Sequence, residues 1–349
     1  MRVLLTAYDR ASSGVGSYTL ELARLLSSKF KVTLLSFDEL EGGGEERRGY
    51  DVIQVKLRWR SRALPLLTYL RNRGEVSKVL GDFDLVHETT PPWGSDSARL
   101  VTTRWGYVSH FKLAVIRTTG LSFPENLGSF PVTLQHYLTD SRSFGRARYV
   151  VDVSRESENF VPPPVELRPP KSYSCDPTLK VLFVSRDLDM PRKNLRTLLE
   201  ASKYLERRVE LHLVGRGGGR AAKYVEVKSR RGGVVAHGFL PREELLSLMR
   251  EVDVLVLPST YEELGYVGLE AYSVGLPVVA SDIPSFRAVF KETPKFPPRD
   301  PRELARVLDG LDCERLEVLG RRSRDFAGRI NEVALRRFAE VYSRVLGTA

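Results

Sequence analysis

The chain has 349 residues, of which 42% are hydrophobic and 28% are charged, a globular composition that excludes wholesale disorder. No apolar run approaches the roughly 20 residues that a membrane-spanning helix requires, and the length favours two domains over one. The net charge is +10, and part of it is concentrated in one segment.

The N-terminal residues Met1–Arg10 contain an apolar run that is too short for a signal peptide. We expect it to be a first β-strand, in a cytoplasmic protein. The two cysteines, Cys175 and Cys313, show no metal-ligand spacing and are expected to build no disulfide framework, which fits a reducing compartment. Cys and Met are scarce while Arg and Glu are abundant, a composition that hints at a thermophile.

Residues 1–160 predict strands that alternate with helices. Apolar residues at helical spacing predict a helix over SYTLELARLLSSKF, after the turn Gly14-Val15-Gly16. Continuous apolar strands with intervening helices predict a parallel, doubly wound sheet. The predicted strands are RVLLTAY, KVTLLSF, DVIQV, DLVHE, RLVTT and RYVVDVS.

The segment Lys56–Arg73 contains six basic residues and no acidic residue, with apolar side chains between them. It fits a solvated basic face, or a segment that docks on an anionic membrane, where each basic residue contributes about 1 kcal/mol. In the second case Arg58, Trp59, Arg60 and Arg62 would touch the membrane. No nucleic-acid motif accompanies the charge, so we expect no nucleic-acid partner.

Residues 161–178 are rich in proline, which interrupts helices and sheets, and are predicted to be an interdomain linker. The alternation then restarts and predicts a second α/β domain over 179–330, with an amphipathic helix over 331–349 that packs on either domain. Two tandem domains of this kind predict a ligand cleft between the carboxyl ends of their strands. The predicted strands of the second domain are KVLFVS, VELHLVG, GVVAHG, VDVLVLP and LPVVASD.

Two segments carry features that suit a phosphate. Gly14 and Gly16 precede a helix N-terminus, where an anion can approach the backbone, although a tight turn explains them equally well. Arg186 follows the strand KVLFVS, and Lys193 precedes the next helix. They fit either two cations for a diphosphate leaving group or an exposed loop. The adjacent Arg192 ranks below them.

A third segment, PSTYEELGYVGLEAYSVG, places Glu262 and Glu270 seven residues apart across a strand-to-helix turn. The first N–H groups of this helix, from Val267 and Gly268, would bind a phosphate. Glu270 is placed for ribose hydroxyls and Glu262 for a hexose hydroxyl. The alternative is that the acidic residues only favour the helix N-terminus electrostatically.

Taken in order, these segments resemble the retaining GT-B glycosyltransferases of the group 1 (family 4-like) type over nearly the whole chain. The resemblance is carried by the glycine turn before YTLELARLL and by SRDLDMPRKNLRTLLEA, GFLPREELLSLMREVDVLVLPS and YEELGYVGLEAYSVGLPVVASD. It implies an α/β fold of two Rossmann-like parallel-sheet domains that face each other across a cleft. It also implies sugar transfer from a UDP-, GDP- or ADP-type nucleotide sugar with retention of configuration, and no metal or other cofactor.

The resemblance also implies roles for individual residues. Arg186 and Lys193 would bind the donor diphosphate, Glu262 the donor sugar and Glu270 the ribose. No protein nucleophile is required if the leaving phosphate assists deprotonation of the acceptor on the same face. The other donor-binding positions implied are Gly14, Gly16, Gly238, Phe239, Glu263, Leu264, Gly265, Val267 and Gly268.

The chain departs from the family pattern at Glu263, at Arg104 and before the linker, where Pro162-Pro163-Pro164-Val165 replaces the usual Asn-Gly turn. Glu263 stands where a glycine is usual and leaves the identity of the donor hexose open. Arg104 stands where relatives carry a histidine; because an arginine is no base at neutral pH, it is expected to recognise a phosphate on the acceptor.

The resulting hypothesis is a retaining, metal-independent hexosyltransferase of glycan biosynthesis. It would be cytoplasmic, with peripheral binding to the inner face of the membrane, and would act on a glycan, lipid-linked or small-molecule acceptor. One alternative is a nucleotide-sugar 2-epimerase of similar fold, which the E-x7-E segment disfavours. Another is a non-catalytic basic binding protein for lipid or nucleic acid, against which the retention of Arg186, Lys193, Glu262 and Glu270 argues.

Overall fold

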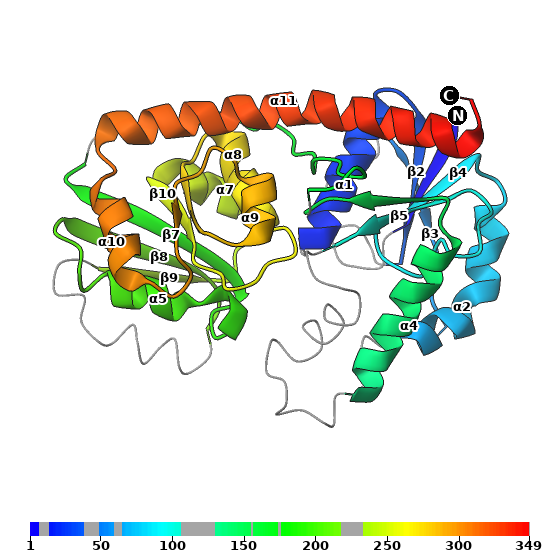
Figure 1. Ribbon diagram of the computed structural model, residues 1–349, viewed down its shortest axis with the longest axis horizontal. Helices are drawn as coiled ribbons and strands as arrows, with labels where there is room; N and C mark the ends of the chain where they lie inside the picture. The colour runs from blue at the N-terminus through cyan, green and yellow to red at the C-terminus, as the bar shows by residue number, and fades with distance from the viewer. Residues whose placement is uncertain are drawn as a thin grey trace. The chain divides into compact units, whose positions relative to one another are not determined.

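The computed structural model describes residues 1–6, 14–37, 49–58, 65–105, 130–154, 156–173, 176–217 and 233–348. The chain divides into two compact units. Unit 1 comprises Met1–Pro164 together with Ile330–Ala349, and unit 2 comprises Val165–Arg329. Each unit is an α/β structure (Figure 1).

Unit 1 contains, among its described residues, a six-stranded parallel sheet in the order β3-β2-β1-β4-β5-β6. The central strand is buried throughout its apolar run, as a strand covered on both faces must be. The strands are β1 Arg2–Thr6, β2 Lys31–Ser36, β3 Asp51–Gln54, β4 Leu85–Glu88, β5 Leu100–Arg104 and β6 Tyr149–Asp152, and the helices are α1 Gly14–Ser27, α2 Pro65–Leu80 and α4 Phe130–Arg146.

Unit 2 repeats this plan, with a described six-stranded parallel sheet in the order β12-β11-β10-β7-β8-β9. Its strands are β7 Thr178–Asp187, β8 Arg208–Arg216, β9 Val234–Gly238, β10 Val254–Leu257, β11 Val278–Ser281 and β12 Lys295–Phe296. Its helical segments are the 3₁₀ turn η3 Pro191–Lys193, α5 Leu195–Ala201, α7 Arg242–Glu251, α8 Tyr266–Val274, α9 Pro284–Val289 and α10 Pro301–Asp309. The predicted α/β class with parallel sheets is confirmed.

The last helix, α11 (Cys313–Leu346), begins in unit 2 and ends in unit 1. Its C-terminal part completes the core of unit 1, where Phe338 and Tyr342 are fully buried. The Tyr342 hydroxyl lies 2.7 Å from Nδ1 of the buried His87. The sequence predicted a helix only from residue 331. Before that point α11 buries residues at helical spacing, but Gly320 and Ser323 among them are not large apolar residues and weaken the pattern.

The described residues between β6 and β7 have no regular secondary structure, and those from Val165 onward belong to unit 2. The buried Lys171 Nζ donates to the carbonyl oxygen of Val252 at 2.5 Å, and the Tyr173 hydroxyl donates to that of Gly275 at 2.6 Å. These two hydrogen bonds hold the segment before β7 within unit 2, whereas the residues just after β6 bond back to Asp152 in unit 1.

One expectation about the cysteines was wrong. Cys313, the first residue of α11, is disulfide-bonded. The other cysteine of the chain, Cys175, lies outside the described residues. Sequence separation carries no information on which cysteines a fold brings together, so the expected absence of a disulfide had no structural basis. Among the described residues, no helix combines the length and apolarity needed to cross a membrane.

Candidate functional site

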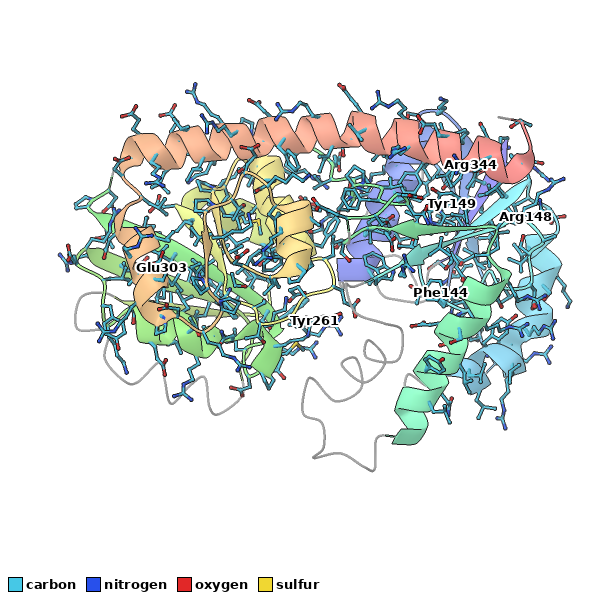
Figure 2. The ribbon with its side chains drawn as sticks, viewed as in Figure 1. Phe144, Arg148, Tyr149, Tyr261, Glu303 and Arg344 are labelled. Atoms are coloured by element: carbon cyan, nitrogen blue, oxygen red, sulfur yellow. The ribbon has the colours of Figure 1, made fainter. Side chains whose placement is uncertain are left out.

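The candidate site lies at the carboxyl edge of the sheet in unit 2. Because all strands of the sheet run parallel, the ends of β7, β8, β9 and β10 share this edge. The loop 258–265 follows β10 and leads into α8, and Figure 2 labels Tyr261 within it. Glu262 in this loop and Glu270 in α8 are both buried.

Gly265 shapes the turn between the two carboxylates. Its φ of +73° is left-handed, and a Cβ there would lie 2.6 Å from Cε1 of the buried Phe286. Only glycine meets both conditions without strain. The next helix therefore starts at Tyr266, which puts Glu270 in its second turn.

Glu262 is paired with two basic side chains that reach the same carboxylate oxygen. Lys193 Nζ lies 2.5 Å and Arg192 Nη1 3.0 Å from Glu262 Oε1, and the Ser259 hydroxyl donates to that oxygen at 3.4 Å. Burial alone would raise the pKa of Glu262, but the charges of Lys193 and Arg192 outweigh it and hold that pKa below its usual value. The carboxylate is thus ionised in a buried site.

The two loops that supply these groups are joined through backbone contacts. The Thr260 N–H donates to the carbonyl oxygen of Arg192 at 2.8 Å, and Asn194 Nδ2 donates to that of Pro258 at 2.9 Å. Asn194 also takes a left-handed conformation that separates η3 from α5. Sequence reasoning ranked Arg192 low; its place beside Lys193 was the signal that could have raised it.

Glu270 is paired with a residue that sequence reasoning did not single out. Arg242, the first residue of α7, places Nε 3.1 Å from Glu270 Oε1. The two side chains come from helices α7 and α8, which pack against each other. The signal that was available is the arginine at the start of the PREELLSLMREV helix.

The other predicted donor-site residues of unit 2 lie along the same edge. Arg186 is exposed near the end of β7. Gly238 has a φ of +68°, and the ring of the half-exposed Phe239 lies 5.6 Å from the guanidinium carbon of Arg216. Phe239 therefore presents an aromatic ring to solvent just after the end of β9.

The N-terminal residues of α8 and its preceding loop differ in part from expectation. The Leu264 side chain is buried and Glu263 is partly exposed. Val267 is partly exposed, but the Gly268 N–H donates to the carbonyl oxygen of Gly265 at 2.9 Å, so it is already engaged as the first turn tightens. Gly268 also packs closely, since a Cβ there would lie 2.6 Å from the Phe290 ring.

In unit 1, Gly14 and Gly16 form the first turn of α1. Arg104 ends β5 and makes a bidentate pair with Asp152, with Nε to Oδ1 at 2.5 Å and Nη2 to Oδ2 at 2.6 Å. That pair uses two of the five N–H donors of the guanidinium, which restricts its use for an acceptor phosphate.

Of the predicted membrane-contacting residues, Arg58 pairs with Glu75 at 2.7 Å. Trp59, Arg60 and Arg62 lie outside the described residues. Within the described part of the chain, no group of three or more His, Cys, Asp or Glu side chains is arranged to hold a metal ion.

The carboxyl-edge site lies within a region that matches a known family model. Residues 178–311 match the model described as glycosyl transferases group 1. These residues form a group 1 glycosyltransferase domain. The match contains Arg186, Lys193, Glu262 and Glu270, so the domain carries all four polar side chains predicted for the donor.

Curated relatives of this group 1 domain match a similar part of the chain. A phosphatidyl-myo-inositol mannosyltransferase from Mycobacterium tuberculosis is 36% identical over 143 residues, which are 38% of this chain and 36% of that protein. The chain therefore spans about a third of the length of the curated relatives it matches.

Solved structures share the fold over nearly the whole chain. WaaG, a glycosyltransferase involved in lipopolysaccharide biosynthesis, has a TM-score of 0.66 at 16% identity and covers 99% of this chain and 100% of its own. Anabaena HepE in complex with UDP has a TM-score of 0.67 at 17% identity, with the same coverage. The fold is that of the GT-B glycosyltransferases.

Proposed function

We propose that the protein is a glycosyltransferase that moves a sugar from a nucleoside diphosphate sugar to an acceptor. The observation that carries the proposal is the pair of buried carboxylates, Glu262 and Glu270, each held by basic side chains at the carboxyl edge of unit 2. Carboxylates accept hydrogen bonds from sugar hydroxyls, and the neighbouring cations suit a diphosphate. The match to the group 1 family supports the same function.

Glu262 is well arranged to bind a donor hydroxyl. All three of its described polar contacts reach Oε1. Among the described residues, none donates to Oε2, which is therefore the oxygen we assign to a hexose hydroxyl. Lys193 and Arg192 keep the carboxylate ionised, and an ionised acceptor makes the stronger hydrogen bond.

We propose a retaining mechanism that requires neither a metal nor a protein nucleophile. The bond between the anomeric carbon and the diphosphate oxygen breaks, and the acceptor oxygen forms its bond to that carbon on the same face. The acceptor proton passes to the leaving phosphate oxygen. Arg186 and Lys193 stabilise the charge that develops on the diphosphate, which is the main contribution the protein makes.

We propose that the nucleotide of the donor is UDP, GDP or ADP and that its base binds beside Gly238 and Phe239. The HepE structure with UDP and the mannosyltransferase relatives support a nucleotide sugar of this kind. Glu263, in the place of the usual glycine, adds a third carboxyl group beside the sugar pocket and is expected to influence the choice of hexose.

For the acceptor we propose a glycan or a lipid-linked molecule, reached by a cytoplasmic protein that binds the inner face of the membrane. Exposed leucines on two packed helices of unit 1 support a membrane surface: Leu67 and Leu70 on α2, and Leu134 and Leu138 on α4. Leu67 and Leu70 belong to the basic segment Lys56–Arg73, whose cations would attract anionic headgroups.

The donor assignment is tested by thermal shift with UDP, GDP, ADP and their sugars, followed by transfer assays. A nucleotide that binds only the folded protein raises its melting temperature. We expect Glu262→Ala and Lys193→Ala to reduce transfer by about 10²-fold or more, the range for a lost charge-stabilising group. The matched variants are Glu314→Ala and Lys203→Ala, two exposed residues of unit 2. Full activity of the site variants on the true donor would overturn the assignment.

Two further outcomes separate the alternative functions. Conversion of the nucleotide sugar to its epimer without an acceptor would identify an epimerase instead. Salt-sensitive binding to nucleic acid, with no stabilisation by any nucleotide, would favour a binding protein. For the membrane, sedimentation with anionic vesicles but not with neutral ones is expected, and Leu70→Asp should abolish it.

A further inference from the structure

Arg242 occupies a position that the folding of its own helix does not explain. It is the first residue of α7, where the positive end of the helix dipole disfavours a cation by about 0.3–1 kcal/mol. The two residues that follow, Glu243 and Glu244, are of the favoured sign. The helix is anchored by its own apolar face, which buries Leu245, Leu246, Leu248 and Met249.

The partner of Arg242 explains this placement better than stability does. Its Nε lies 3.1 Å from Glu270 Oε1, with side-chain exposures of 24% for the arginine and 9% for the glutamate. Withdrawing two charges from water offsets most of the gain from their attraction, so a buried ion pair is a weak source of stability. A pair of this kind is more useful for fixing where a carboxylate points.

The pair has a direct consequence for a sugar diol. An ionised carboxylate has about four lone-pair sites, so the contact with Arg242 leaves capacity for further donors. Arg242 therefore fixes the direction in which the Glu270 carboxylate points.

We propose that Arg242 is the positioning residue for ribose recognition: it holds the Glu270 carboxylate in the orientation that accepts from the 2′- and 3′-hydroxyls of the donor ribose. This inference rests on the proposed function, because it deepens the role of Glu270 in the same donor site. Preference for ribonucleotides over nucleotides that lack both hydroxyls then depends on the arginine, although the arginine itself does not touch the ribose.

The test uses the full-length protein with UDP, GDP and ADP and the 2′,3′-dideoxy counterpart of each. Dissociation constants are measured by calorimetry for the wild type, Arg242→Leu, Arg242→Lys and Glu270→Gln. Arg250→Leu, in the last turn of the same helix, is the matched control. Circular dichroism and melting curves establish that each variant is folded.

We expect the wild type to prefer the ribonucleotide by about 10-fold or more, as for charge-assisted hydrogen bonds. Arg242→Leu should lose most of that preference, with affinity for the dideoxy nucleotide changed less than about 2-fold, and Arg242→Lys should restore part of it. In the Glu270→Gln background, Arg242→Leu should have no further effect. If Arg242→Leu does not fold, the lysine variant and the double-variant comparison carry the test.

Two results overturn the inference alone. One is an unchanged preference in Arg242→Leu, and the other is an equal loss of affinity for both nucleotides, which would place the arginine at the phosphates or the base. If no nucleotide binds the wild type, the proposed function fails together with the inference, so the two failures are distinguishable.

Discussion

Replacing Lys193 by methionine removes one of the two cations on Glu262 while preserving most of the buried side-chain volume. Breaking a buried pair completely costs about 3–5 kcal/mol, but Arg192 remains 3.0 Å from the same oxygen. The expected loss is therefore that of one charged hydrogen bond, about 1.5–3 kcal/mol. For a unit of this size each kcal/mol lowers the melting temperature by about 2–4 °C, so we expect about 3–12 °C.

The loss should depend on pH in a defined direction. The pKa of Glu262 is lowered in the folded protein, so its contribution is present above the unfolded value of about 4.3 and is lost as the pH falls through the folded pKa. Melting curves at pH 8 should show the full difference between Lys193→Met and the wild type. As the pH falls below the folded pKa of Glu262, the difference should shrink toward zero or reverse, because Lys193 and Arg192 then face a neutral side chain.

The control for this experiment is Lys203→Met, which changes an exposed lysine of the same unit and should leave the melting temperature within about 1 °C. A drop that stays constant from pH 8 down through the acid range below about pH 4.3 would refute the reasoning, since it would show that Lys193 stabilises the protein by packing and not through the charge of Glu262.

Three further predictions concern stability. Gly265→Ala should destabilise unit 2 by about 2–5 kcal/mol in thermal unfolding, because it adds left-handed strain and a contact with Phe286. Tyr342→Phe should lower the melting temperature of unit 1 equally at pH 5 and pH 8. Burial lowers the pKa of His87 to about 3, so the imidazole is neutral at both pH values, and removing its hydrogen-bond partner should cost about 1–3 kcal/mol of folding stability. Burial raises the pKa of Glu88 to about 7, so the free energy of unfolding of unit 1 should fall by about 3 kcal/mol as the pH rises from about 4.3 to 7. Glu88→Gln should remove this dependence of stability on pH.

Much of the fold could be predicted because buried parallel strands are continuous apolar runs. Val254–Leu257, for example, is fully apolar and became β10. The short β12, Lys295–Phe296, has no such run and was missed. Helix α2 was also missed, because it begins at a proline and contains many polar residues, so the sequence was interpreted as an irregular basic segment.

From the sequence we could predict only those site residues that belong to a recognisable motif. Lys193 and Glu262 belong to recognisable segments, and the structure brings them within 2.5 Å. The pairing of Arg242 with Glu270 depends on how α7 packs on α8, and no spacing within either segment encodes it. The adjacency of Arg192 to Lys193 marked it as a candidate, but that both side chains reach the same oxygen of Glu262 depends on the fold of the loop.

The path of α11 has a consequence for how the protein is made on the ribosome. Unit 2 is one continuous stretch of chain, whereas unit 1 needs the residues from Ile330 onward. Phe338 and Tyr342 can reach His87 only after the C-terminal part of α11 has emerged from the exit tunnel. The unit that is synthesised first is therefore completed last, and until then it exposes the apolar surface that α11 will cover, when nascent chains are most prone to aggregate.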